Sequence, residues 1–374
     1  MTITPLHEKK RRSVPVRRLP APSAGQPLST LNNPLVISGD ARKVAALLPP
    51  LSVDLIVTSP PYWRKRDYGH AQQLGQEATP DAFVKALLGA MDSWRAVLKP
   101  SASVFLNLGD SIRDGQMVGV TTLFEVEAIR HGWGLASRIM WAKRSGLPDP
   151  HGRLAQRYEL IFQLTPPGGA RPYTDTFAYS QRFDLSEGNI WHMPHRPSRS
   201  AHLAPFPEEL PSRALLLACP ERVCAGCGQP LQRMTQRGLK LDPARKQSEK
   251  ALERWHAASL TTDHLRAIRA TGISDAGKSL KYQDGAGANS AEVTQLAAEA
   301  KRALGGYFRE FTFALPEHCG WTSCQKCEAG TAWLPGLVLD PFVGTGTTLR
   351  AAQAAGRRSV GVDLRPMLPD PVQP

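Results

Sequence analysis

The stretch that decides the fold reads LVLDPFVGTGTT and runs from Leu337 to Thr348. Its first four residues are mostly apolar and end in an acid, which predicts a short buried strand. Two glycines follow, Gly344 and Gly346, and they let the backbone approach a ligand closely. The threonines begin a helix, whose N-terminus favours polar or anionic groups. A strand, a glycine-rich turn and a helix in this order predict a ligand-binding α/β unit.

A second strand extends this unit. The helix ends at Gly356, a residue type common just after helices, and the run SVGV from Ser359 leads to Asp363. Asp363 lies about 20 residues after the turn, where dinucleotide-binding folds place an acid against a ribose hydroxyl. The Gly-x-Gly pair alone is weak evidence, but its strand-turn-helix context and Asp363 make it strong.

The other informative stretch is TSPPYW, from Thr58 to Trp63, which follows the apolar run VDLIV. Two successive prolines fix φ and remove two backbone donors, so the loop is stiff and its carbonyl groups are available as acceptors. Ser59 adds a hydroxyl and Tyr62 adds an aromatic face. The loop therefore offers acceptors for an amine beside a platform for a planar ring. A rigid turn without function is the alternative interpretation.

Together the two stretches resemble the DNA methyltransferases that methylate exocyclic amines with S-adenosylmethionine. In that family the Ser-Pro-Pro-Tyr-like loop is catalytic and the Phe-x-Gly-x-Gly loop holds the cofactor. The catalytic loop comes first here, as in the family's circularly permuted beta order. The resemblance spans about Leu35 to Leu364 apart from one insertion. It implies an α/β, Rossmann-like sheet, mostly parallel with an antiparallel hairpin.

The resemblance also implies roles for individual residues. The Ser59 hydroxyl and the Pro60 carbonyl would accept the amine protons, while Tyr62 stacks on a flipped base and Trp63 lines its pocket. Asp40 would lie beside the cofactor's adenine, although capping the next helix is an equally good interpretation. The catalytic candidates are Ser59, Pro60, Pro61 and Tyr62, and the cofactor candidates are Asp40, Asp340, Pro341, Phe342, Gly344, Gly346, Thr347 and Asp363.

Further candidates are weaker. Asn107 and Asp110 follow a predicted strand, and ligands of parallel α/β sheets bind at such strand ends. His202 and Phe206 belong to a segment that lines the cofactor site in the family, although a core histidine is the commoner case. The basic loop 143–157 is expected to contact DNA, and a solvated surface loop is the alternative.

Four of the six cysteines form two Cys-x-x-Cys pairs, Cys224 with Cys227 and Cys324 with Cys327. This spacing lets two thiolates reach one tetrahedral zinc, so the pairs predict a structural zinc site with four sulfur ligands. Cys319 is a spare candidate. Reduced thiols without metal are the alternative.

The zinc would hold together the ends of an inserted helical segment. The expected organisation is a disordered basic tail at 1–30, a catalytic part at 31–223, the zinc-bound insertion at 224–327 and a cofactor-binding part at 328–374. The insertion is expected to take part in target recognition with residues 165–200. Its DNA-contact candidates are Arg245, Lys246, Lys278 and Lys281, and a plain solvated insert is the alternative.

Composition favours double-stranded DNA as the partner. The chain of 374 residues carries a net charge of +13, and its pI of about 9.7 suits a polyanion. No apolar run is long enough to span a membrane, and no signal sequence is evident, so a cytoplasmic location is expected. A cognate restriction nuclease and a homodimer remain open as partners.

The target base is predicted from Ser59. In the family, Ser at this position goes more often with cytosine and Asp or Asn more often with adenine. A neutral hydroxyl suits the electron-rich cytosine ring, so N4-cytosine is favoured over N6-adenine. Two alternatives from other classes are a catalytically silent zinc- and DNA-binding relative, and a methyltransferase that acts on RNA or protein amides.

Overall fold

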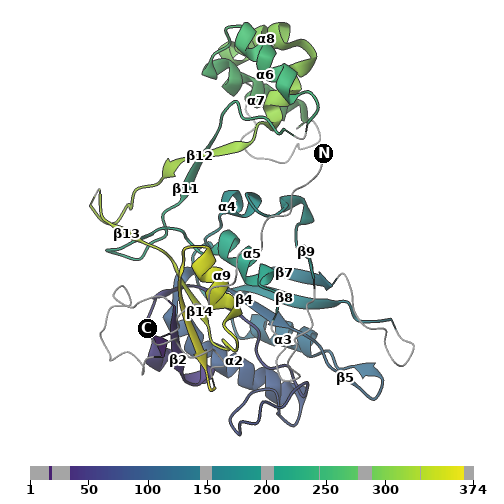
Figure 1. Ribbon diagram of the computed structural model, residues 1–374, viewed down its shortest axis with the longest axis vertical. Coiled ribbons are helices and arrows are strands. Elements are labelled where there is room, and N and C mark those ends of the chain that lie inside the picture. Colours follow the sequence, from purple (N-terminus) through teal and green to yellow (C-terminus); the bar gives the residue numbers. More distant parts are fainter. Residues whose placement is uncertain are drawn as a thin grey trace, which may run out of the picture. The chain divides into compact units, whose positions relative to one another are not determined.

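The computed structural model describes residues 17–18, 34–143, 154–194, 206–243, 245–276, 289–328 and 330–365. It divides into two compact units, the larger made of residues 1–232 and 323–374 and the smaller of residues 233–322. Figure 1 shows the larger unit arranged around a sheet and the smaller as helices joined to a two-stranded ribbon.

The larger unit is built on a sheet of nine strands among the described residues. They are β1 (Arg17–Arg18), β2 (Leu35–Ser38), β3 (Val53–Thr58), β4 (Leu98–Leu108), β7 (Gly134–Lys143), β8 (Tyr158–Thr165), β9 (Ile190–Met193), β14 (Leu337–Asp340) and β15 (Arg358–Asp363). Their order is β1-β2-β15-β14-β3-β4-β8-β7-β9, and within this sheet β8 alone runs antiparallel to its neighbours. The predicted mostly parallel sheet with an antiparallel hairpin is confirmed.

The permuted chain brings its two distant motifs together through β3 and β14. These strands are parallel neighbours, with Val338 opposite Leu55 and Leu339 opposite Ile56. The carboxyl ends of parallel neighbours lie at the same edge of a sheet. The loop after Thr58 therefore emerges beside the loop after Asp340, although 282 residues separate the two in sequence.

Helices cover both faces of this sheet (Figure 1). Ile56 packs into the core formed with α2 (Pro80–Val97) and α3 (Val120–Arg130). Its neighbours in β3, Leu55 and Val57, pack into the core formed with α5 (Glu209–Ala218) and α9 (Thr347–Ala354). Burial on both faces explains why β3 reads as a nearly continuous apolar run.

Short elements complete the larger unit. They are η2 (Ala41–Lys43), α1 (Val44–Leu47), α4 (Thr176–Ser180), η3 (Leu185–Glu187), the hairpin of β5 (Ile112–Arg113) with β6 (Gln116–Met117), and the ribbon of β10 (Val223–Cys224) with β13 (Trp333–Leu334). Helix α2 begins at Pro80, because Thr79 caps it by accepting the backbone N–H of Ala82 at 3.2 Å and proline suits the first turn.

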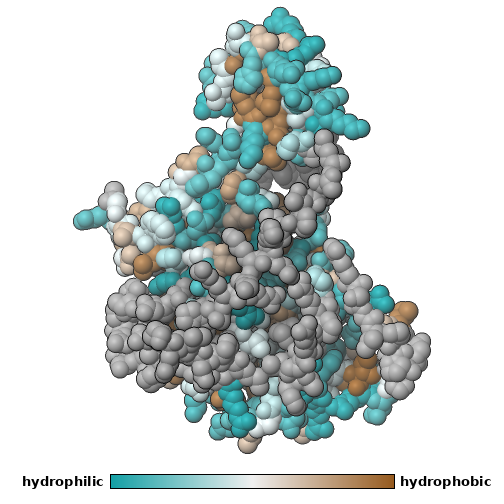
Figure 2. All heavy atoms as spheres, viewed as in Figure 1, coloured by the Kyte–Doolittle hydropathy of each residue, from teal (hydrophilic) through white to brown (hydrophobic). Residues whose placement is uncertain are grey.

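The smaller unit has its own core. It contains β11 (Arg233–Arg237), α6 (Ser248–Ala257), α7 (Thr262–Ala276), α8 (Ala291–Leu304), η5 (Gly305–Phe313) and β12 (Pro316–Trp321), and β11 pairs antiparallel with β12. Trp255 and Phe311 pack with ring centroids 4.8 Å apart. Figure 2 shows a hydrophobic area among hydrophilic side chains on the helical part of this unit.

Two helices of the smaller unit fit the expected helical insertion. Helix α6 is followed along the chain by α8, in which Ala297, Ala300 and Leu304 form a buried stripe. Ser290 caps α8, because its hydroxyl accepts the N–H of Val293 at 3.2 Å. Helix α7 and the ribbon are features that the sequence did not reveal.

Part of the chain lies outside the described residues. Of the expected basic tail, the structure describes Arg17–Arg18, whose backbone pairs parallel with Leu35 and Val36 at the edge of the sheet. Most of the loop 143–157 is outside the description, as are Lys278 and Lys281. Within the described part, no helix is both long and apolar enough to cross a bilayer.

Candidate active site

The loop that follows β3 forms one wall of a cavity of about 610 Å³ at the carboxyl edge of the sheet. Ser59, Pro60, Pro61 and Tyr62 all line it. Two glycines leave room for this loop. A methyl group on Gly75 would lie 3.0 Å from the Tyr62 carbonyl oxygen, and one on Gly109 would lie 2.6 Å from Tyr62 Cε2. The loop is therefore held closely from both sides.

The loop that follows β14 forms the opposite wall, and Asp340 ties the two loops together. One of its carboxylate oxygens accepts the Thr58 hydroxyl at 2.7 Å, and the other accepts the Thr348 hydroxyl at 2.6 Å. The backbone N–H of Phe342 also donates to it, at 3.1 Å. Burial raises the pKa of Asp340 to about 6, although these hydrogen bonds oppose the rise. Its carboxylate is thus engaged within the protein.

The glycine-rich turn approaches Asp363 at the end of β15. The backbone N–H of Gly344 donates to Asp363 Oδ2 at 3.0 Å. Gly344 has φ +47° and Gly346 has φ +76°, conformations that favour glycine and turn the chain into α9. Gly346 does not line the cavity, whereas Pro341, Phe342, Gly344, Thr347 and Asp363 do.

Asp40 also lines the cavity, and both of its predicted roles are compatible with the geometry. It caps η2 by accepting the N–H of Arg42 at 2.9 Å, and it forms an ion pair with the Arg42 guanidinium at 2.6 Å. Although partial burial would raise it, the pKa of Asp40 is lowered by these contacts. The neighbouring Gly39 N–H donates to the Asp363 carbonyl at 2.9 Å, so β2 and β15 hold both acids at one edge.

A cluster of polar side chains faces Tyr62, and it contains the candidate Asn107 together with Glu159 and Lys143, which the sequence analysis did not mark as catalytic. Glu159 near the start of β8 accepts the Tyr62 hydroxyl at 2.6 Å, and Lys143 at the end of β7 donates to Glu159 at 2.6 Å. Asn107 at the end of β4 joins them, and all four line the cavity. A single carboxylate within the apolar run YELIF was the sequence signal for Glu159, because a charge on a buried strand needs a partner.

Two other candidates, Trp63 and Asp110, have structural places instead. Trp63 does not line the cavity but is buried, and its indole N–H donates to the Glu77 carbonyl at 3.0 Å. Trp141 lines the cavity. Asp110 caps α3, since its carboxylate accepts the N–H groups of Gly119 and Val120. Phe206 lines the cavity as expected, and His202 lies outside the described residues.

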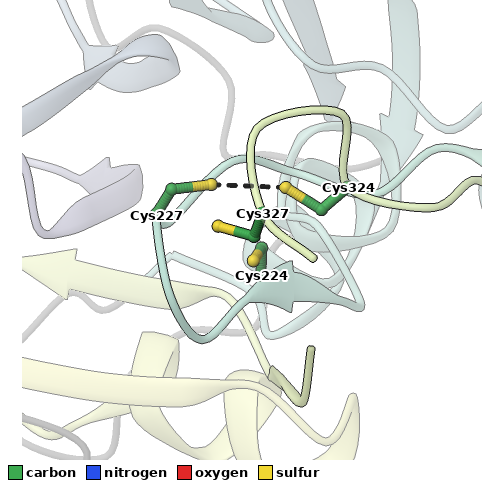
Figure 3. Close-up of side chains that lie close together, drawn as sticks. All are labelled: Cys224, Cys227, Cys324 and Cys327. Atoms are coloured by element: carbon green, nitrogen blue, oxygen red, sulfur yellow. Dashed lines mark hydrogen bonds between the residues drawn. The ribbon is translucent and has the colours of Figure 1, made fainter. Parts of the chain in front are cut away.

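The four cysteines of the two Cys-x-x-Cys pairs come together in the larger unit (Figure 3). All four sulfur atoms lie within 4.8 Å of one another, and Cys227 Sγ lies 3.4 Å from Cys324 Sγ. Sulfurs around a tetrahedral zinc are about 3.8 Å apart, given Zn–S distances of about 2.3 Å. A methyl group on Gly226 would lie 3.1 Å from Cys327 Sγ, so the knuckle backbone runs close to that sulfur. The donor set therefore fits a closed zinc site.

Cys319, the spare zinc-ligand candidate, and Arg245, a DNA-contact candidate, both lie in the smaller unit. Cys319 lies on β12 of the smaller unit and, among the described residues, is not a member of the cysteine cluster. Arg245 forms an ion pair with the largely buried Glu310 at 2.6 Å and stacks on Phe313. It therefore stabilises the smaller unit. Lys246 is exposed there.

Comparison of this chain with known proteins identifies DNA methyltransferases as its relatives. A model of the N6/N4 DNA methylase family matches residues 53–225 and 235–368. The type II methyltransferase M.Cfr9I of Citrobacter freundii is 27% identical over 236 residues, which are 51% of this chain and 78% of that protein. M.XycI of Xanthomonas campestris pv. cyanopsidis is 27% identical over 214 residues, which are 48% of this chain and 71% of that protein.

Among solved structures, PvuII DNA methyltransferase, named as cytosine-N4-specific, shares the fold. It matches with a TM-score of 0.50 at 15% identity, over 90% of this chain and 84% of the other. The family match takes in the loops after both β3 and β14, the two stretches on which the resemblance rested. The chain therefore belongs to the N6/N4 family of DNA methylases.

Proposed function

We propose that this protein transfers a methyl group from S-adenosylmethionine to N4 of a cytosine flipped out of double-stranded DNA. The observation that carries the proposal is the shared cavity. The loop of Ser59 and the loop of Gly344 open into the same space at the carboxyl edge of neighbouring parallel strands. A donor held by one loop would thus meet an acceptor held by the other.

The cofactor would lie against the Gly344 side of the cavity. A volume of about 610 Å³ falls in the range typical of small-molecule sites. Asp363 is suited to a ribose hydroxyl, because each of its oxygens accepts one backbone N–H and retains a lone pair. Asp40 and Phe342 would flank the adenine. S-adenosylmethionine supplies an electrophilic methyl group on a sulfonium.

The chain's own contribution to the reaction is orientation. An exocyclic amine conjugated with its ring is a poor nucleophile, so its lone pair must be drawn out of conjugation and aimed at the methyl group. We assign the Ser59 hydroxyl and the Pro60 carbonyl as acceptors for the amine protons. The half-buried ring of Tyr62 would stack on the base, with Trp141 nearby on the cavity wall.

Cytosine is the favoured target because the catalytic loop begins with a neutral hydroxyl at Ser59, not with a carboxylate. The cytosine-N4-specific name of the PvuII enzyme, which shares the fold, agrees with this choice. The target atom is inaccessible inside a duplex, so the base must leave the stack to reach the cavity. The net charge of +13 favours the polyanionic substrate.

We further propose that the cysteine cluster binds a structural zinc. Four sulfur ligands leave no open coordination position, so the metal would stabilise and not catalyse. Cys224 and Cys227 precede the smaller unit in sequence, and Cys324 and Cys327 follow it. The metal would therefore fix the two points at which the chain leaves and re-enters the larger unit. The inserted unit, together with residues 165–200, is our candidate for target recognition.

Tritium transfer from labelled S-adenosylmethionine tests the activity. Purified protein should label duplex DNA and neither RNA nor protein, and Ser59→Ala should strongly reduce the rate of labelling. Labelled RNA or protein would favour an amide or RNA substrate. A protein that binds the cofactor in calorimetry but labels nothing would be the catalytically silent relative.

A further inference from the structure

Glu159 and Lys143 form an ion pair beside the catalytic loop that the mechanism above leaves without a role. Lys143 Nζ lies 2.6 Å from Glu159 Oε1, and each side chain is 17% exposed. Taking two charges largely out of water is costly unless further hydrogen bonds satisfy them. Glu159 receives two such bonds through its other oxygen, from Tyr62 at 2.6 Å and from Asn107 Nδ2 at 2.9 Å.

Neighbouring side chains use the full hydrogen-bonding capacity of the Tyr62 hydroxyl. A phenol hydroxyl has one hydrogen to donate and two lone pairs to accept. Its hydrogen goes to Glu159, and its lone pairs accept Asn107 Nδ2 at 2.8 Å and the Ser59 hydroxyl at 3.3 Å. With its only hydrogen directed to Glu159, Tyr62 cannot donate to Ser59.

The direction of these bonds depends on Glu159 being ionised. Burial would raise the pKa of Glu159, but the Lys143 ammonium and the hydrogen bonds from Tyr62 and Asn107 outweigh it and lower that pKa. Burial and the adjacent carboxylate raise the pKa of Tyr62 well above its usual value, so Tyr62 keeps its proton. An ionised carboxylate only accepts, so every hydroxyl and amide here must donate toward it.

The orientation of the Asn107 amide is also set by the carboxylate of Glu159. Its amide nitrogen faces Glu159 and Tyr62, while its Oδ1 is buried without a hydrogen-bond partner among the described residues. A buried unpaired acceptor is unfavourable. Rotating the amide would place Oδ1 against the carboxylate oxygen of Glu159. The orientation is therefore imposed by that carboxylate.

We propose that Glu159 is a positioning residue that fixes Ser59 as a pure hydrogen-bond acceptor. The Ser59 hydrogen is committed to Tyr62, whose own hydrogen is committed to Glu159. Ser59 then presents only lone pairs to the cavity, which suits an amine that must be drawn out of conjugation. The inference rests on the proposed function and adds a part of the chain, β8, that no motif had marked.

A double-mutant cycle at saturating cofactor and DNA tests this chain of bonds. Glu159→Gln places an amide where either end can face Tyr62, so Ser59 is no longer forced to accept. We expect kcat to fall about 30-fold, with the Kd for S-adenosylmethionine changed by less than about threefold. Tyr62→Phe should fall similarly, and the double variant should be no worse than the poorer single one. Glu125→Gln, which breaks the ion pair with Arg138 on the neighbouring β7, is the matched control.

A second variant covers the case in which Glu159→Gln does not fold. Lys143→Gln removes the main group that lowers the pKa of Glu159, while Lys65 and Tyr62 remain facing it. The acid limb of the kcat–pH profile should then move to higher pH, because a protonated Glu159 can donate to Tyr62. A merely structural role for the pair would leave that limb unmoved.

The outcomes separate this inference from the proposed function. Wild-type protein without any methyl transfer would overturn the function itself. An active wild type together with a fully active Glu159→Gln, or with losses in the two single variants that multiply in the double variant, would overturn the role of Glu159 alone. An unmoved acid limb in Lys143→Gln would do the same.

Discussion

Gly109→Ala should lower kcat, because the added methyl group would push the Tyr62 ring of the catalytic loop out of place. A methyl group on Gly109 would lie 2.6 Å from Tyr62 Cε2 and 3.0 Å from Cδ2, where nonbonded carbons normally lie about 3.5–4.0 Å apart. The ring must therefore move by about 1 Å. It cannot move freely, because its hydroxyl is bonded to Glu159 at 2.6 Å.

The size of the effect follows from this bond. A displacement of about 1 Å would lengthen it beyond the hydrogen-bonding range. A hydrogen bond to a charged group contributes about 1.5–3 kcal/mol, which corresponds to about 10- to 150-fold in rate if it is realised in the transition state. Misplacing a catalytic group by about 1 Å typically costs about 100-fold, so we expect kcat to fall by about that factor.

Single-turnover methylation measures the effect, and calorimetry measures cofactor binding. The Kd for S-adenosylmethionine should change by less than about threefold, because Gly109 lies outside the cavity wall formed by Gly344 and Asp363. Gly89→Ala is the control, since Gly89 is exposed within α2 and has nothing within 4 Å of the added methyl. Wild-type kcat in Gly109→Ala would refute the reasoning.

Three further predictions concern the Ser59 hydroxyl, the cysteines and the buried acid. Ser59→Ala should lower kcat at least about 100-fold without weakening cofactor binding in calorimetry, because it removes an acceptor for the amine and no part of the cofactor loop; undiminished turnover would contradict this. Cys227→Ser should reduce bound zinc from about one equivalent to near zero by elemental analysis and lower the unfolding temperature, whereas Cys319→Ser, outside the cluster, should keep the metal. Zinc-free wild-type protein would end that proposal. Because its pKa is raised to about 6, Asp340 contributes stability that is complete below about pH 4 and is lost as the pH rises through about 6. Urea unfolding of Asp340→Asn should lack this decline, and an unchanged pH dependence would count against it.

The meeting of the two distant loops follows from the family resemblance together with the strand patterns. The run before Ser59 and the run before Asp340 both read as buried strands, and parallel strands carry their ligand sites at one edge. Their adjacency as β3 and β14 confirms that expectation. The two Cys-x-x-Cys pairs likewise predicted a cluster, because each spacing already fixes half of a tetrahedral ligand set.

Other features depend on contacts that no local pattern specifies. Glu159 reaches Tyr62 across 97 residues because antiparallel β8 pairs with β4, and that register is a property of the whole sheet. The motif placed Asp340 among the cofactor candidates, and it does line the cavity, but no local pattern showed that threonines from two elements engage its carboxylate. Trp63 looked like a pocket residue because it follows the catalytic loop, yet the turn directs it into the core.

The most direct test of the central claim is the identity of the modified base. Genomic DNA from cells that lack their own DNA methylases and express this protein can be hydrolysed to nucleosides and analysed by mass spectrometry. We predict N4-methylcytosine with the wild-type chain and a strongly reduced amount with Ser59→Ala. N6-methyladenine alone, or no methylated base despite folded wild-type protein, would contradict the account.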